Sequence, residues 1–485
     1  MKREPNIKIN AVLNIIKTLS SILFPLITFP YISRVLQPEN IGKINFSTSF
    51  ITYFSLVASL GITTYAIREC ALVRKEKEKL NLISSQIFSI NVYTTIISYI
   101  LLFISLIIFR KFDDYRVIII IHSLTISFNT IGCEWLNTAM EDYKYITIRS
   151  VFFQILSLVL MFIFVRCPDD YIKYAIITVI SSSGVNISNV LYRRKFGKIK
   201  FIKKPNFKKH FKPIVLLFVM LLAQNIFNSS DITMIGIFHG DYSVGLYSTS
   251  VKITNLIAQV VASLVWVILP KMSNLFESND YAKINQILKK VFNVLLTIGI
   301  PCSVGTIVLS SELIEIIAGV DYVGAAFSLK ILMISFIFNL IGQFYLGNMI
   351  LLPSKKEKLF MILCCVSTIV NLILNLIFIP IYGINAAACT TMFSTFLLMI
   401  MLYLTKDKNI EFTFNDVAVS LINSLCIVII YLIVDLVISS LYIKVALNII
   451  LSGSIYLIIL YLEKNELVMD VLKSIKRIKG VAKHE

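Results

Sequence analysis

Five ionisable residues lie inside long hydrophobic segments, where a lone charge costs about 2.5 to 3.5 kcal/mol on insertion scales. Lys17, Lys252 and Lys330 are the basic members, and Asp231 and Asp435 are the acidic members. Such side chains must face protein or water, so we expect them to mark polar sites inside the protein. An ammonium group binds an anion as a point charge, and a half-buried aspartate can titrate near working pH. Asp231 is therefore our candidate for coupling to an H⁺ or Na⁺ gradient.

Four further charged residues are candidates for a gate or a cavity wall. Arg34 and Arg68 follow the first two hydrophobic segments, and Glu134 and Arg149 flank a polar turn that contains Glu141. Glu134 and Glu141 are seven residues apart, and Glu141 and Arg149 are eight apart, so a continuous helix would place each pair on one face. The spacing predicts a gating network. Solvated structural pairing is the alternative. For Arg68 the alternative is helix termination and orientation, and for Arg34 it is to hold a connection.

Each intramembrane lysine also has a structural interpretation. Lys17 lies about two turns into its segment, so its side chain could extend to the headgroups. Lys252 lies about ten residues into its segment, where a buried pair with Asp231 is the alternative to a site. Lys330, the fifth candidate for a gate or cavity, lies near a segment end and could meet the interface instead.

Patterns typical of enzymes or metal sites are missing from the sequence. The four histidines are scattered, the eight cysteines form no CxxC pair, and no GxxxxGK[ST] loop occurs. The acidic pairs at 113–114 and 169–170 lie in loops too short for an acceptor platform. We therefore predict no catalytic site, no metal and no cofactor other than a coupling ion.

The elements that must position these residues are transmembrane helices. The chain is 57% hydrophobic and 15% charged, and its mean hydropathy is +0.81. Hydrophobic stretches of about 20 residues recur, each long enough to cross a hydrocarbon core of about 30 Å. The sequence predicts an all-α integral membrane protein with about fourteen transmembrane helices, at 9–32, 42–67, 83–109, 116–139, 145–165, 172–192, 213–237, 243–268, 291–310, 325–351, 359–379, 383–405, 414–438 and 441–462.

The formal charge of +18 is explained by membrane orientation. With the N-terminus in the cytoplasm, most of the 46 Lys and Arg residues fall in cytoplasmic loops and tails, notably 68–79, 193–212 and 473–479. An even number of spans places the C-terminus in the cytoplasm too. The basic residues would contact anionic lipid headgroups, and no nucleic-acid partner is expected. We also expect the first helix to be retained, because no cleavage site follows it.

One long basic connection divides the predicted helices. Residues 193–212 separate a six-helix lobe at 1–192 from a second six-helix lobe at 213–405, and residues 406–462 would form two additional helices before a basic tail at 463–485. A short echo supports a repeat: NIGKINFSTS at 40–49 and SVGLYSTS at 243–250 occupy equivalent places. Six spans return the chain to its starting side, so the repeat would be parallel, with a substrate site between the lobes.

Several stretches carry a family resemblance. Residues 24–43 read FPLITFPYISRVLQPENIGK, and residues 61–69 read GITTYAIRE. Together with 134–149, 231–252 and 371–388, they resemble the polysaccharide flippase family of the multidrug, oligosaccharidyl-lipid and polysaccharide exporter superfamily. The likeness covers the chain to about residue 405. Thr138 and Ala139 stand where relatives often have Gln-Gly, and Ala386 replaces a usual glycine, but neither difference removes a charge.

The resemblance implies a transporter of the bacterial cytoplasmic (inner) membrane. Its substrate would be an undecaprenyl-diphosphate-linked oligosaccharide, moved to the outer leaflet for O-antigen, capsule or exopolysaccharide assembly. Lys17 and Lys252 would present opposed cations to the diphosphate. A polysaccharide polymerase and chain-length machinery are the partners that this function suggests. The alternatives are a multidrug or peptidoglycan-precursor exporter of the same superfamily, or a membrane glycosyltransferase or polymerase.

Overall fold

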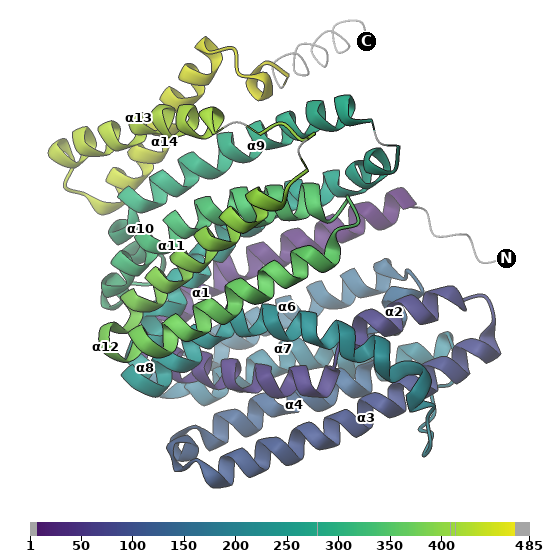
Figure 1. Cartoon of the computed structure of the whole chain (residues 1–485). Coiled ribbons are helices and arrows are strands. Elements are labelled where there is room, and N and C mark those ends of the chain that lie inside the picture. Colours follow the sequence, from purple (N-terminus) through teal and green to yellow (C-terminus); the bar gives the residue numbers. More distant parts are fainter. Residues whose placement is uncertain (1–6, 279, 408, 413, 471–485) are drawn as a thin grey trace, which may run out of the picture. The chain divides into compact units, whose positions relative to one another are not determined.

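The computed structural model of this chain describes residues 7–278, 280–407, 409–412 and 414–470. These residues form helices joined by short turns (Figure 1). The helices belong to two compact units, Met1–Gly245 and Leu246–Glu485. The all-α membrane class predicted from hydropathy is thereby confirmed, whereas the predicted lobe boundary at 193–212 stays a prediction.

Unit 1 contains seven long or short α-helices and the first part of an eighth. Their bounds are α1 (Ile7–Ser59), α2 (Ile62–Leu72), α3 (Lys77–Ile108), α4 (Arg116–Gly132), α5 (Glu134–Ala139), α6 (Tyr143–Phe164), α7 (Tyr171–Tyr192) and α8 (Phe207–Ser278). Short 3₁₀ turns, η1 (Arg110–Tyr115), η2 (Pro168–Asp170) and η3 (Arg193–Lys195), connect several of them. Helix α4 packs along α7, and α1 packs along α3, α4 and α6.

Unit 2 contains the end of α8 and the remaining helices. They are α9 (Tyr281–Val308), α10 (Ser310–Ile317), η4 (Val320–Ala325), α11 (Ala326–Asn339), the π-helix η5 (Leu340–Leu351), α12 (Glu357–Thr405), α13 (Asn415–Val437) and α14 (Leu441–Leu462). Helix α11 packs against α12, and α13 packs between α9 and α14. The last two helices are therefore part of the packing of unit 2.

In the part of the chain that the structure describes, ten helices are long and apolar enough to cross a membrane, and a bent pair within α8 adds an eleventh. Three of the long helices, α1, α8 and α12, each cover two predicted spans or most of two. The helices thus account for all fourteen predicted spans.

Each of these three helices contains one residue with non-helical backbone where its two spans meet. The residues are Gln37 (φ 63°), Gly240 (φ 77°) and Gly383 (φ 62°). A positive φ is costly for a residue with a side chain, so glycine suits two of the three positions. At the third, Pro38 follows Gln37, and proline is favoured at the first position of a helix. The chain therefore changes direction without a loop.

The repeated motif packs against itself through two glycines. Gly42 and Gly245 each lie five residues after a break, at Gln37 and Gly240 respectively. A Cβ on Gly42 would overlap the backbone carbonyl of Asp241, and one on Gly245 would overlap that of Pro38. The two copies of the motif thus approach each other backbone to backbone, which only glycine permits.

The basic connection after α7 runs as an extended strap along α3. The backbone N–H groups of Lys198, Lys200 and Ile202 donate to Asn81 Oδ1, Ser85 Oγ and Ser89 Oγ at 2.8, 3.0 and 2.7 Å. Four helical residues rise about 6 Å and two extended residues rise about 6.6 Å, so the two periods match.

The strap ends at a buried histidine. The Nδ1 of His210 lies 2.8 Å from the hydroxyl of Tyr65, and its Nε2 lies 2.8 Å from Oε1 of Gln86. His210 is fully buried. Both ring nitrogens therefore have partners, and the start of α8 is fixed to α2 and α3.

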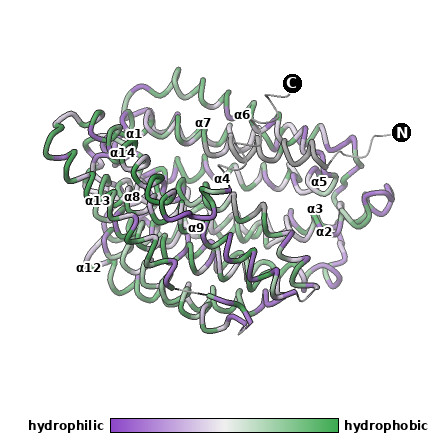
Figure 2. Tube along the Cα trace, turned by 90° about the horizontal axis from the view of Figure 1, so that it is seen from above, coloured by the Kyte–Doolittle hydropathy of each residue, from purple (hydrophilic) through white to green (hydrophobic). Residues whose placement is uncertain are grey.

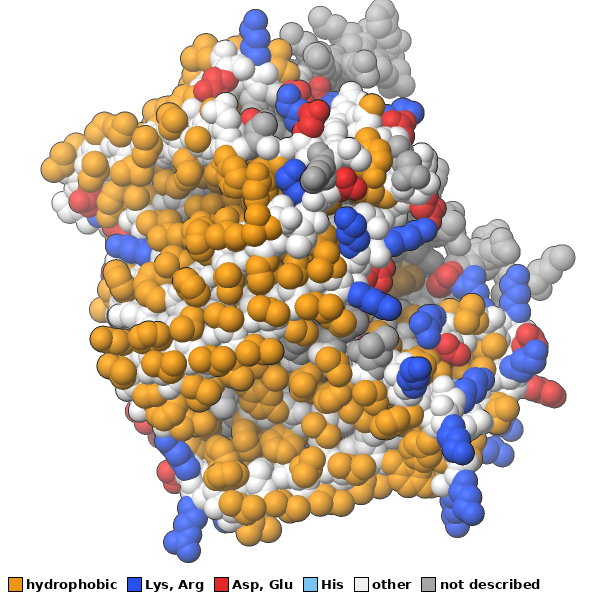
Figure 3. All heavy atoms as spheres, viewed as in Figure 1, with side chains coloured by type: hydrophobic (Ala, Val, Ile, Leu, Met, Phe, Trp, Pro, Cys, Tyr) orange, Lys and Arg blue, Asp and Glu red, His pale blue; other side chains and the backbone are white. Residues whose placement is uncertain are grey.

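The outward faces of the helices are apolar. Large hydrophobic side chains such as Ile107, Ile155, Ile369 and Leu436 are more than half exposed. Figure 2 shows hydrophobic residues along the helices and hydrophilic residues mainly near their ends. On the face drawn in Figure 3, hydrophobic side chains cover the helices, while Lys and Arg side chains gather toward helix ends. This distribution is that of helices surrounded by lipid.

An ion cluster joins α10, α13 and α14 in unit 2. Lys444 lies 3.1 Å from Glu312 and also pairs with Asp435. The hydroxyl of Tyr431 donates to Glu312 at 2.9 Å. The intramembrane Asp435 found in the sequence is thus one of two carboxylates that share Lys444.

Candidate functional site

A charged network inside unit 1 centres on Arg149. Its Nη2 lies 3.0 Å from Oε1 of Glu134, its Nη1 donates to Oδ1 of Asn189, and its guanidinium lies 5.2 Å from the ring centre of Tyr145. The amide of Asn137 also donates to Oδ1 of Asn189, at 2.6 Å. The Arg149 side chain is 3% exposed and that of Glu134 is 39% exposed. One carboxylate thus reaches a polar space while its partner cation is buried.

This network depends on two breaks between α4 and α6. Cys133 (φ 48°) and Glu141 (φ 56°) both have left-handed backbone, and Asp142 accepts the N–H of Tyr145 to begin α6. The continuous helix assumed for the spacing of Glu134, Glu141 and Arg149 does not exist. As a result, Glu134 meets Arg149, and Glu141 pairs instead with Arg74 at 2.6 Å.

The first of these breaks, at Cys133, contains a buried thiol. Cys133 is fully buried, and its Sγ lies 2.9 Å from Nη1 of Arg193. Because it is fully buried, the thiol serves packing rather than chemistry.

A second layer of contacts supports the network from α7. Tyr192 donates to Oδ2 of Asp142 at 2.6 Å and stacks on Tyr145 with ring centres 3.5 Å apart. Lys195 lies 3.3 Å from the same carboxylate. Sequence reasoning missed Asn189 and these partners because it searched hydrophobic segments for ionisable residues only. Asparagines within such segments are the signal that would have found Asn189.

Glu134 lines a polar cavity of about 430 Å³ in unit 1. It is the only ionisable residue in that lining, among asparagine, serine and threonine side chains of α1 to α5, α7 and α8. Most of these groups are already paired: Asn186 donates to Asn129, Thr130 pairs with Thr95, and Asn91 donates to the carbonyl of Ala58. The cavity wall is therefore a fixed polar framework with one carboxylate.

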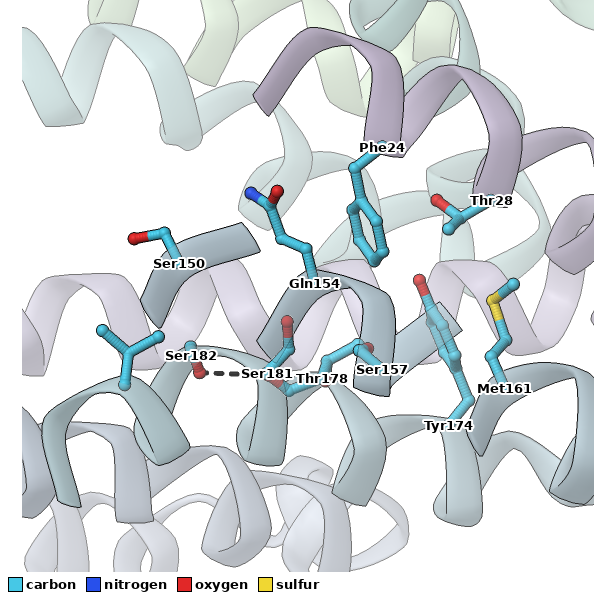
Figure 4. A pocket seen from close by; sticks show the side chains of 11 residues that line it. Phe24, Thr28, Ser150, Gln154, Ser157, Met161, Tyr174, Thr178, Ser181 and Ser182 are labelled. Atoms are coloured by element: carbon cyan, nitrogen blue, oxygen red, sulfur yellow. Dashed lines mark hydrogen bonds between the residues drawn. The ribbon is translucent and has the colours of Figure 1, made fainter. Parts of the chain in front are cut away.

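A second cavity of about 330 Å³ lies between α1, α6 and α7 (Figure 4). Among the described residues, its lining contains serine, threonine, glutamine and tyrosine side chains together with Phe24, Met161 and Val185, and no charged side chain. Figure 4 shows Phe24 extending from α1 toward the pocket and the hydroxyl of Tyr174 extending from α7 toward α1. The described part of this lining is therefore uncharged.

Among the described residues, the structure does not place the three predicted lysines together in one site. The side chain of Lys17 lies outside the described residues, although its backbone is part of α1. Lys252 is half-buried in α8, in unit 2, and Lys330 is half-buried in α11. Their predicted roles at a diphosphate site and in the cavity or gate stay predictions.

Asp231 is buried in α8, at 5% exposure, beside a cluster of hydroxyl groups. Ser49 Oγ donates to the carbonyl of Ser229 at 2.9 Å and lies 2.8 Å from Oγ1 of Thr233. Tyr53 lies 3.1 Å from the same Thr233 atom. A buried carboxylate near hydroxyl oxygens has ligand chemistry suited to a proton or a hard cation.

The two predicted arginines near helix ends are exposed. Arg34 lies three residues before the Gln37 break of α1. Arg68 lies 3.4 Å from Glu69 and over the ring of Tyr65, 5.7 Å from its centre. Neither lines the two cavities described above. Among the described residues, no three His, Cys, Asp or Glu side chains gather as metal ligands.

Known proteins are similar to this chain in sequence and in fold. Residues 7–276 match the family model described as "Polysaccharide biosynthesis protein". A protein of Escherichia coli (strain K12) named for O-antigen transport is 24% identical over 345 residues, which cover 70% of this chain and 82% of that protein. The Staphylococcus aureus capsular polysaccharide biosynthesis protein CapF is 26% identical over 408 residues, covering 81% and 96%. The solved structure of the lipid II flippase MurJ, in an inward closed conformation, aligns with a TM-score of 0.75 at 16% identity over 95% of this chain and 99% of that chain.

Proposed function

We propose a substrate for this chain from the family to which it belongs, the polysaccharide biosynthesis proteins. The chain is a flippase-like membrane transporter, as its relatives and its fold indicate. The substrate that we infer is an undecaprenyl-diphosphate-linked oligosaccharide repeat unit. The transporter moves it from the cytoplasmic to the outer leaflet of the inner membrane by alternating access, and both chain termini are cytoplasmic.

The observation that carries this proposal is a polar interior within an apolar exterior. Sugars and a diphosphate cannot cross hydrocarbon unaided, because each polar group would lose its hydrogen bonds. The two cavities of unit 1 offer hydroxyl, amide and carboxylate groups within helices whose outer faces are hydrophobic. A prenyl tail can stay in lipid while the headgroup passes through such an interior.

Deletion of the encoding gene tests the proposal. We expect completed repeat units to accumulate on the cytoplasmic leaflet and surface polysaccharide to be lost, with both restored by the wild-type gene. The measurement is a leaflet-resolved assay of the lipid-linked oligosaccharide. Units that reach the outer leaflet but stay unpolymerised would instead identify a polymerase, and accumulation of the peptidoglycan precursor would identify a different flippase.

Lys17 and Lys252 are the residues that we propose for the diphosphate. Two ammonium groups would neutralise its charge as point charges. The double variant Lys17→Ala/Lys252→Ala is expected to lose most transport while its amount in the membrane stays unchanged. Transport is measured by the same leaflet assay, with membrane insertion checked by blotting. Normal transport by the double variant would remove both lysines from the site.

Transport also needs an energy source and moving gates. We propose that Asp231 couples transport to an H⁺ or Na⁺ gradient, and that Arg34, Arg68, Lys330 and the Glu134–Arg149 pair act in gating or line the path. Uphill uptake of substrate into inverted vesicles that is insensitive to both gradients would reject the coupling. A polymerase and chain-length proteins are the proposed partners, since they consume the product at the outer leaflet.

A further inference from the structure

We propose that the neutral cavity between α1, α6 and α7 binds the sugar residues of the substrate, separately from its diphosphate. This inference rests on the proposed function and adds to it a glycan subsite within unit 1. It assigns recognition of the sugars to uncharged hydroxyl and amide groups. Charged residues elsewhere would then recognise only the diphosphate, which all lipid-linked substrates of this class share.

The first argument is that the polar groups of this cavity are unpaired. In the part of the chain that the structure describes, six lining side chains make no hydrogen bond to protein: Thr28, Ser150, Gln154, Ser157, Tyr174 and Ser181. Two of them, Ser157 and Thr28, are only 5% and 7% exposed. Their donors and acceptors are thus available to a ligand or water in the cavity.

Serine and threonine side chains in helices ordinarily form hydrogen bonds within their own helix. Their hydroxyls donate to the carbonyl three or four residues earlier. In the same cavity, Thr178 donates to Ala175 at 2.8 Å, and Ser182 donates to Thr178 at 3.0 Å, the bond dashed in Figure 4. Thr28, Ser150, Ser157 and Ser181 lack such bonds, although these bonds would relieve the cost of an unpaired hydroxyl in a membrane interior. Six groups oriented this way make a polar surface suited to a ligand.

The second argument is that the described side chains of the lining carry no charge. Arg149, next to Ser150 in sequence, pairs with Glu134 and Asn189 and does not line the cavity. A diphosphate or a cationic drug would lose its hydration here without a counter-charge. Sugar hydroxyls both donate and accept, as do serine, threonine and tyrosine hydroxyls. Neutral polyhydroxyl groups therefore match the lining best.

The third argument is shape. The cavity follows α6 from Ser150 to Met161, a rise of about 16 Å. Its volume of about 330 Å³ lies within the range of about 300 to 1,000 Å³ for small-ligand sites. The rings of Phe24 and Tyr174 supply flat apolar surface beside the polar groups (Figure 4). An elongated neutral cavity with two aromatic rings suits a short run of sugars.

The cavity that contains Glu134 is a useful contrast. Its asparagines and threonines are largely paired with each other or with backbone carbonyls. Those groups stabilise the helix packing and are not available to a ligand. The unpaired lining, rather than polarity alone, therefore distinguishes the proposed glycan subsite.

Binding to the full-length protein in nanodiscs tests the inference. One probe is the lipid-linked repeat unit purified from the producing strain, and the other is undecaprenyl diphosphate without sugar. The test variant is Gln154→Ala/Tyr174→Phe/Ser181→Ala. The matched control is Ser105→Ala/Thr125→Ala/Ser188→Ala, whose hydroxyls donate to their own helices and do not line the cavity.

We expect the test variant to bind the glycan probe at least about tenfold more weakly, at about two- to tenfold for each hydrogen bond lost. Its affinity for undecaprenyl diphosphate should change less than about twofold, and the control should match wild type with both probes. Should the triple variant unfold early in a thermal scan, Tyr174→Phe alone keeps the ring and should weaken glycan binding about two- to tenfold.

Equal weakening with both probes, or no weakening, would overturn the glycan subsite and leave the proposed function intact. Wild-type protein that binds the glycan probe no better than an ordinary phospholipid would overturn the proposed function as well.

Discussion

Replacing Arg149 with alanine should destabilise unit 1 by about 3 kcal/mol and abolish transport. The side chain is 3% exposed and binds Glu134, Asn189 and the ring of Tyr145. Removing one member of a buried ion pair costs about 3 to 5 kcal/mol, because the other charge loses its partner. The expected loss of stability lies at the low end of this range because Glu134 is partly exposed. Thermal unfolding in detergent measures the stability, and the leaflet assay measures transport.

Two further variants separate the contribution of charge from that of packing, one at Arg149 and one at a control position. Arg149→Lys keeps the charge but cannot contact Glu134 and Asn189 at once with a planar fork, so its stability should fall between wild type and Arg149→Ala. The control is Arg116→Ala, whose pair with Asp113 is about half exposed and should be worth less than about 1 kcal/mol. A stable Arg149→Ala protein with normal transport would show that the network has no part in either property.

Replacing Gly42 with alanine should destabilise the protein by about 2 to 3 kcal/mol. The added methyl group would overlap the backbone carbonyl of Asp241, which cannot rotate away as a flexible side chain could. Gly245→Ala should act in the same way against Pro38. Both effects are measured as a lower unfolding temperature of the purified protein.

Gly453→Ala is the control for this pair of variants. Gly453 lies in α14, and nothing lies within 4 Å of the position that its Cβ would occupy. Alanine there should leave stability unchanged or raise it slightly. Equal behaviour of Gly42→Ala and Gly453→Ala would contradict the close contact of the two motif copies.

Hydropathy predicted the helices well because length and apolar composition are local properties of the chain. Sequence could not predict that consecutive spans join at a single non-helical residue, as they do at Gly240 within α8. A positive φ at one residue redirects a helix without a loop, and the residues that allow it include Gln37, whose type gives no signal. The position within the repeated motif gives a better signal. The breaks at Gln37 and Gly240 each lie five residues before a motif glycine.

The candidate site was predicted in part because charge is easy to find in hydrophobic sequence. Glu134 and Arg149 were both identified, but the spacing rule that linked them through Glu141 failed where the helix breaks. The neutral cavity could not be predicted. Serines such as Ser181 are ordinary in membrane helices, and only tertiary structure reveals which hydroxyls lack a partner.

The strap along α3 limits how the connection between α7 and α8 can vary. Alternate N–H groups, those of Lys198, Lys200 and Ile202, face every fourth residue of the helix. Inserting a single residue would turn the following N–H groups away from their acceptors, whereas inserting two would keep the alternation and move the chain one helical turn along. We therefore expect the fold to tolerate insertions in this connection in steps of two residues, because its hydrogen bonds to α3 fix its length.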